Sequence, residues 1–119
     1  MKISPEAIIA DDNLCLKYKS FFISGNDEGY ISALASLMAE FYLNRGFVKK
    51  NLTDENGVGP DLFKIEDGYV YVCEKNINNN TVEEIENNND ILIICQKTSP
   101  KNKSTKQFFS NSNKRVLVD

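Results

Sequence analysis

The clearest hydrophobic pattern in the chain lies between residues 28 and 45. Apolar side chains recur there at the three- and four-residue spacing of a helix with one buried face, and they are Tyr30, Ile31, Leu34, Leu37, Met38, Phe41 and Tyr42. The positions expected to be core on that face are Tyr30, Leu34, Leu37, Met38 and Phe41. A polar row, consisting of Ser32, Ser36, Glu40 and Asn44, follows at every fourth residue on the other side. Turn-forming residues 24–27 precede this helix and Gly46 follows it, as expected for a helix with a glycine at its end.

Two segments have the pattern of β-hairpins. Residues 3–10 and 14–23 are apolar stretches on either side of the turn formers 11–13, which predicts a first hairpin. In residues 14–18 apolar and polar positions alternate, as in a half-buried strand. Residues 62–66 and 69–73 flank Asp67-Gly68, a dipeptide typical of tight hairpin turns.

The remaining segments alternate between short helices and short strands. Phe47-Val48 is expected to begin a strand, and residues 51–60 are expected to form a loop. Possible capping boxes predict short helices over 81–87 and 104–109. The continuous apolar run 91–95 is typical of a central strand covered on both faces, and 116–118 is expected to be the last strand.

This order of elements predicts a fold of the α+β (mixed α/β) class. We expect a mixed β-sheet with one long amphipathic helix and two short helices packed on it. The chain has 119 residues, which fits a single domain spanning residues 1–119. No internal repeat and no linker divides it.

The amino-acid composition excludes several kinds of catalytic and metal-binding site. The chain has no histidine, so it cannot by itself build a Ser-His-Asp triad, a Cys-His pair or a histidine-ligated metal site. Its cysteines, Cys15, Cys73 and Cys95, are odd in number and widely spaced, which favours buried free thiols over disulfides or a zinc site. We therefore expect no catalytic residues, no metal and no cofactor.

The apolar segments are too short for a membrane span. The longest unbroken run, 91–95, is far below the length needed to cross a bilayer. We expect no targeting signal in the first residues, because no long apolar region follows them. We expect a cytoplasmic protein with no membrane partner.

One local pattern resembles the PD-(D/E)xK nucleases. In that family an acidic residue opens one strand of a hairpin, and an acidic residue and a lysine on the next strand hold a divalent metal. Here Pro60-Asp61 and Cys73-Glu74-Lys75 stand in those places. The chain departs from the family because Cys73 occupies a position that should be acidic, and because Glu74 and Lys75, being adjacent on a strand, would point to opposite faces. The resemblance thus implies a catalytically inactive relative.

A second resemblance lies in residues 91–109, which run from an apolar strand through Ser99-Pro100 to a short helix, together with 43–47 upstream. These segments resemble the jaw domain of the fifth subunit of nuclear RNA polymerases, itself an inactive relative of the nuclease fold. The resemblance implies a module of a larger nucleic-acid machine. We expect no counterpart of the assembly domain that follows the jaw in that subunit, since residues 1–119 are expected to form one domain.

Charge is distributed unevenly along the chain. Residues 1–50 are neutral, residues 51–96 carry ten acids and two bases, and residues 97–119 carry six bases and one acid. The basic segment lies in a chain of net charge −3 and has no interleaved aromatics, so nucleic acid is not the expected partner.

The acidic middle segment instead predicts a protein partner. We expect a small acidic, non-catalytic binding protein that docks on a basic surface, with an inhibitor or immunity protein that neutralises a basic enzyme or nuclease toxin as one form. The catalytically dead nuclease-fold module is the alternative. The residues expected to form the acidic partner-binding rim are Asp54, Glu55, Glu83, Glu84, Glu86 and Asp90. Oligomeric state does not follow from these patterns.

Overall fold

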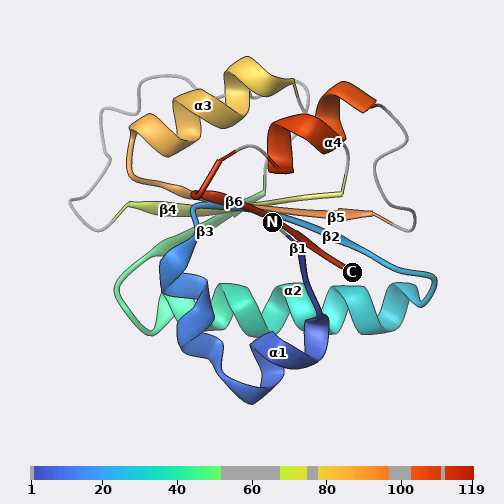
Figure 1. Cartoon of the computed structure of the whole chain (residues 1–119). Coiled ribbons are helices and arrows are strands. Elements are labelled where there is room, and N and C mark those ends of the chain that lie inside the picture. The colour runs from blue at the N-terminus through green and yellow to red at the C-terminus, as the bar shows by residue number, and fades with distance from the viewer. Residues whose placement is uncertain (1, 52–67, 75–77, 97–102, 111) are drawn as a thin grey trace.

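The computed structural model describes residues 2–51, 68–74, 78–96, 103–110 and 112–119 (Figure 1). Along the chain its elements are β1 (Lys2–Ile3), α1 (Pro5–Ala10), the 3₁₀ helix η1 (Asp12–Lys17), β2 (Ser20–Ser24), α2 (Glu28–Leu43), β3 (Val48–Asn51), β4 (Tyr69–Cys73), α3 (Asn79–Asn87), β5 (Ile91–Gln96), α4 (Lys103–Ser110) and β6 (Arg115–Val118). Helices and a sheet combine in one layered unit, which confirms the predicted class.

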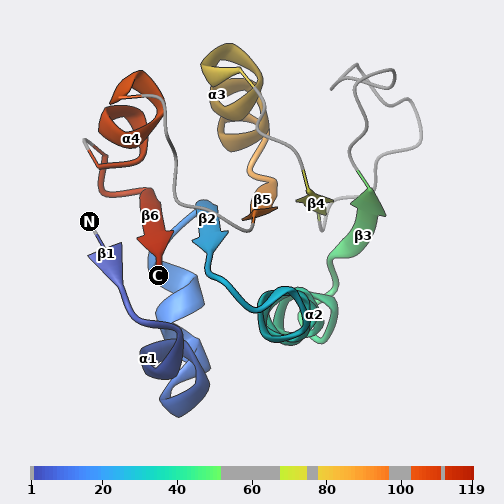
Figure 2. The ribbon, with the colours of Figure 1, turned by 90° about the vertical axis from the view of Figure 1, so that its right-hand side faces the viewer.

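The sheet has six strands in the order β1-β6-β2-β5-β4-β3, and every pair of neighbours is parallel. The predicted mixed sheet is therefore wrong in its strand directions. Parallel strands need crossover connections, so helices lie on both faces. Figure 2 shows α1 and α2 below the sheet and α3 and α4 above it.

The central strands show why two covering layers are needed. In β2, Phe21 and Ile23 face α1, η1 and α2, whereas Phe22 faces α3 and α4. In β5, Ile93 faces the α2 side and Leu92 faces the side of α3 and α4, and both side chains are fully buried. The prediction that the run 91–95 forms a central strand covered on both faces is confirmed.

Neither predicted hairpin forms around its turn. Ser4 caps α1 by accepting a hydrogen bond from the Ala7 N–H, with Pro5 in the first turn, and the Asp11 side chain caps η1. Residues 3–17 are thus mostly helical where two strands were predicted.

The second predicted hairpin, 62–66 with 69–73, is replaced by parallel pairing. Strand β4 pairs in parallel with β3 on one edge and with β5 on the other, so both of its edges are taken. The expected first strand, 62–66, and most of the expected loop 51–60 lie outside the described residues.

Several local predictions are confirmed. Helix α2 starts after the Asp27 cap, whose carboxylate accepts a hydrogen bond from the Tyr30 N–H at 3.1 Å, and Gly46 follows the helix with a φ of 93°. The expected short helices correspond to α3 and α4, and the expected strands that begin near 48 and 116 to β3 and β6. The Asn78 side chain, at the position before α3, caps that helix in place of the capping box predicted at Thr81.

The buried face of α2 differs from the predicted stripe. Leu34, Met38 and Phe41 are buried, but Tyr30 and Leu37 are 41% and 47% exposed. Ile31 and Tyr42, which belong to the same apolar repeat of the sequence, are buried as expected, and the small residues Ala35 and Ala39 complete the packed face. Small side chains let the helix approach the sheet closely, and a search for large apolar residues passes over them.

None of the helices in the described ranges is long and apolar enough to cross a bilayer.

The packing of α2 makes a stability prediction. Leu34→Ala should lower the free energy of unfolding by about 2–5 kcal/mol, because a fully packed leucine leaves a cavity. The matched change Leu37→Ala, one turn away on the exposed side, should cost about 0.5 kcal/mol or less. Urea unfolding of both variants measures the difference. Equal losses would mean that the helix packs through a different face.

Candidate functional site

The predicted acidic rim does not form as a unit. Glu83 and Glu84 lie exposed on α3, as expected, but Glu86 and Asp90 are only 6% and 1% exposed. The expectation of an exposed acidic segment is therefore wrong for these two residues. Asp54 and Glu55 lie outside the described residues.

Glu86 is part of a buried ion pair that connects four elements. The Arg115 guanidinium donates through Nε to Glu86 Oε2 at 3.0 Å and through Nη2 to Oε1 at 2.9 Å. The Ser20 hydroxyl donates to Oε2 at 2.8 Å. Arg115 also stacks 3.7 Å above the centre of the Phe108 ring. The network joins β2, β6, α3 and α4 at the amino ends of the strands, and a bidentate pair of this kind fixes geometry as well as charge.

Asp90 has a local structural role. Its Oδ1 accepts a hydrogen bond from the Tyr69 N–H at 2.9 Å, which ties the segment before β5 to the start of β4. Gly68 precedes Tyr69 with a φ of 81°, and a Cβ atom there would lie 3.1 Å from the same Oδ1 atom. The Asp90 carboxylate therefore lies close to Gly68, where a side chain would crowd it. Because Asp90 is buried and hydrogen-bonded inside the fold, it is not available to a binding partner.

A crevice opens at the other end of the sheet, where the strands reach their carboxyl ends. Neighbouring strands β2 and β5 are followed by helices on opposite faces, α2 below and α4 above (Figure 2). In open parallel sheets ligands bind at this kind of switch point. The crevice has a volume of about 830 Å³, within the range of small-molecule sites. Its lining residues are Glu28, Gly29, Ile31, Ser32, Ala35, Ser36, Lys49, Val72, Glu74, Cys95 and Gln96.

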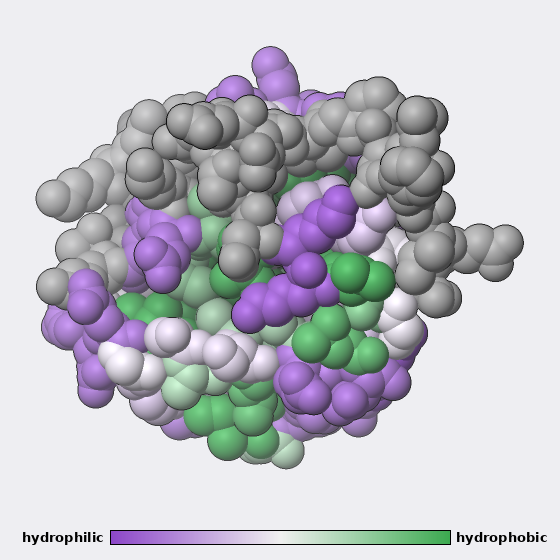
Figure 3. All heavy atoms as spheres, turned by 180° about the vertical axis from the view of Figure 1, so that it is seen from behind, coloured by the Kyte–Doolittle hydropathy of each residue, from purple (hydrophilic) through white to green (hydrophobic). Residues whose placement is uncertain are grey.

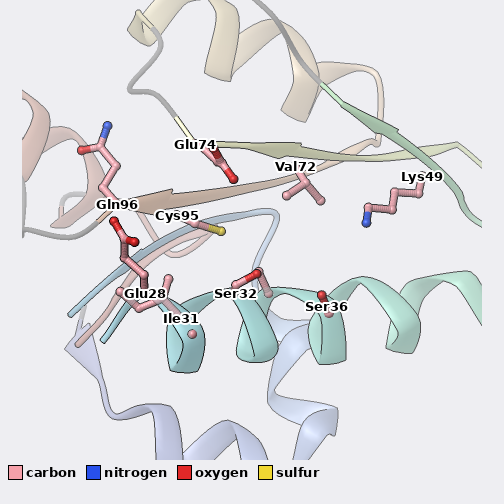
Figure 4. A pocket seen from close by; sticks show the side chains of 11 residues that line it. Glu28, Ile31, Ser32, Ser36, Lys49, Val72, Glu74, Cys95 and Gln96 are labelled. Atoms are coloured by element: carbon pink, nitrogen blue, oxygen red, sulfur yellow. The ribbon is translucent and has the colours of Figure 1, made fainter. Parts of the chain in front are cut away.

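The floor of the crevice is the amino-terminal half of α2. Glu28, Ser32 and Ser36 follow one another at four-residue spacing and line it from below (Figure 4). Ser32 and Ser36 belong to the polar row seen in the sequence, which therefore faces a hollow at its start. Ala35 and Gly29 add only small side chains. A floor of small residues leaves the space that longer side chains would fill.

The roof is formed by side chains that point from three strands toward α2. Val72 shares the α2 side of β4 with Val70, and Glu74, two residues further on, lies over the same space. Lys49 pairs in register with Val70 and extends from β3, and Cys95 reaches down from β5 (Figure 4). Figure 3, from the side opposite to Figure 1, shows hydrophobic surface in a hollow between hydrophilic residues.

The start of α2 is not open to an anion. The Asp27 carboxylate already accepts from the Tyr30 N–H, and Glu28 adds a second acid to the first turn. Helix amino termini favour negative charge, and here the chain supplies that charge itself. A phosphate at this position would meet two carboxylates.

Cys95 is the one thiol on the crevice surface. Burial raises its pKa to about 11, the nearby Glu74 carboxylate and Cys73 add to the rise, and Lys49 opposes it. The thiol is therefore protonated at neutral pH, and the thiolate is the nucleophilic form. Cys95 is suited to packing against a ligand and not to attacking one.

The nuclease-like pattern is only partly visible. Cys73 is buried on the α3 side of the sheet, whereas Glu74 lines the crevice on the α2 side. Asp61 and Lys75 lie outside the described residues. Within the described ranges no three acidic or thiol side chains gather as metal ligands would.

The crevice residues were not recognised as a set from the sequence. Lys49, Glu74 and Cys95 belong to different strands, and only the order of those strands brings them over α2. The polar row of α2 was the one available signal. A scan against models of protein families found no match, and a search of curated proteins found none either. Function is therefore inferred from the crevice and from the exposed face of α3.

The Glu86 network predicts that a substitution at this buried acid costs far more stability than substitutions at the exposed acids of the same helix. Glu86→Lys should lower the free energy of unfolding by about 3–5 kcal/mol, because it leaves Arg115 without its partner and adds a like charge beside it. Glu83→Lys and Glu84→Lys on the same helix should each change stability by less than about 1 kcal/mol. Thermal unfolding of the three variants is the measurement, and a stable Glu86→Lys protein would contradict the network.

Proposed function

We propose that this chain is a non-catalytic binding domain that holds a small polar molecule in the crevice between α2 and the carboxyl ends of β4 and β5. The observation that carries this proposal is the convergence of charged and hydroxyl side chains on one concave space. Glu28 and Ser32 come from the helix, and Lys49 and Glu74 come from the strands. A large pocket with a few convergent polar groups is where a fold of this type binds its ligand.

Binding without catalysis fits the side chains present. The Cys95 thiol is held protonated by burial, which raises its pKa to about 11. The chain has no histidine to serve as a general base. Serine hydroxyls such as Ser32 and Ser36 are weak nucleophiles without such a base, but they are good hydrogen-bond partners.

The crevice makes a prediction for ligand screening. When small polar fragments are added to ¹⁵N-labelled protein, we expect the amide shifts of the wild type to cluster on Ser32, Ser36, Glu74 and their neighbours. Ser32→Trp should abolish these shifts, because the indole fills the space above the helix. Ala33→Trp is the matched control, since Ala33 is exposed on the same helix but does not line the crevice. Shifts that persist in Ser32→Trp, or that gather on another face, would rule out crevice binding.

A second candidate is the expected interaction with a basic protein. It is favoured by Glu83 and Glu84, which are adjacent and exposed on α3. Since Glu86 and Asp90 are buried, this acidic surface is now limited to those two residues among the described ones. An inhibitor or immunity protein that neutralises a basic enzyme would use such a surface to speed association.

Co-purification from the source cell, at low and at high salt, tests this second candidate. A basic protein that is retained by the wild type and lost by Glu83→Lys/Glu84→Lys supports it, with the loss largest at low salt because exposed charges are screened. Recovery of polymerase subunits would support the inactive nuclease-fold module instead. Equal recovery of the same proteins by both forms would remove α3 as the docking surface.

A further inference from the structure

The crevice carries opposite charges at its two ends. The carboxylates of Glu28 and Glu74 lie toward the carboxyl ends of the strands, and the Lys49 amino group enters from the β3 side (Figure 4). The surface is therefore bipolar. A ligand that complements it has a positive group at the acidic end and a negative group near Lys49.

The strand register gives the spacing of these ends. Lys49 pairs with Val70, and Glu74 follows Val70 by four residues. At about 3.3 Å per residue their backbones are separated by roughly 13 Å along the strands. The Lys49 side chain points toward the middle of the crevice (Figure 4).

The middle of the crevice suits a backbone with apolar side chains. Ile31, Ala35 and Val72 offer apolar surface, and the hydroxyls of Ser32 and Ser36 offer donors and acceptors between the charged ends. Cys95 lines the same crevice as the Glu74 carboxylate and the Lys49 ammonium. The two opposite charges thus act on one shared space.

We propose that the ligand of the crevice is a short zwitterion of the size of a dipeptide or tripeptide. Its ammonium group contacts Glu74 and its carboxylate contacts Lys49. An extended dipeptide or tripeptide spans roughly 7–10 Å, which leaves the rest of the roughly 13 Å between the backbones of Lys49 and Glu74 to their two side chains. This inference rests on the proposed crevice function and adds the class of ligand. A phosphorylated ligand would put its negative charge beside Asp27 and Glu28 if it bound at the helix start.

The test uses peptides that keep or lose one charge. Calorimetry would compare dileucine and trileucine with their C-terminal amides and with their N-acetyl forms. We expect the free peptides to bind at least tenfold more tightly than either singly charged analogue, since each analogue loses one charge-assisted hydrogen bond.

Variants assign each charge to its end of the ligand. Lys49→Gln should weaken the free peptides about tenfold and leave the amides unchanged, because the amides have no carboxylate to lose. Glu74→Gln should weaken the free peptides and the amides but not the N-acetyl forms. The matched controls are Lys50→Gln, whose side chain lies over Tyr69 on the other face, and Glu83→Gln on α3. Both controls should bind as the wild type does.

The outcomes separate this inference from the function on which it rests. If polar fragments map to the crevice but the free peptides bind no better than their analogues, the zwitterion class is wrong and crevice binding stands. If neither peptides nor fragments shift a crevice amide, both are wrong. If Lys49→Gln and Lys50→Gln weaken the peptides equally, the bipolar arrangement does not recognise the ligand.

Discussion

Burial of the β2–β5 pair on both faces is the constraint on which the structure depends. Phe21, Phe22, Leu92 and Ile93 are all removed from water, so neither face of the sheet centre can be left uncovered. Parallel strands meet this need because each connection returns over one face as a helix. The same arrangement sends the chain below the sheet after β2 and above it after β5, and the crevice lies where the two paths part.

Charged side chains around the sheet occur in two different settings. At the amino ends of the strands, Glu86 and Arg115 pair with each other, and the described part of the chain contains no buried polar side-chain atom without a hydrogen-bond partner. On the α2 side of the sheet, Glu74 after β4 and Lys49 near the start of β3 instead line the crevice. Charged side chains that pair with each other inside the fold hold elements together, whereas charged side chains that line a crevice can bind a ligand.

The crevice exists because α2 presents different residues to the core and to the space beside it. Gly29, Ser32 and Ser36 line the crevice, whereas Ile31 and Leu34 from the same turns pack into the core with Met38 and Tyr42. The small residues on the crevice side leave open the space that larger side chains would fill. One helix therefore contributes both to stability and to the candidate site.

The sequence by itself determined the elements whose signals are local. The apolar repeat and the Asp27 cap specify α2, and the run 91–95 specifies a strand covered on both faces, because these depend on neighbours within a few residues. Only the tertiary structure decided that β4 lies between two parallel strands, that Glu86 faces Arg115, and that Lys49, Glu74 and Cys95 meet above α2. Strand order and the pairing of distant charges depend on residues 20 or more positions apart, and no periodicity within one segment records them.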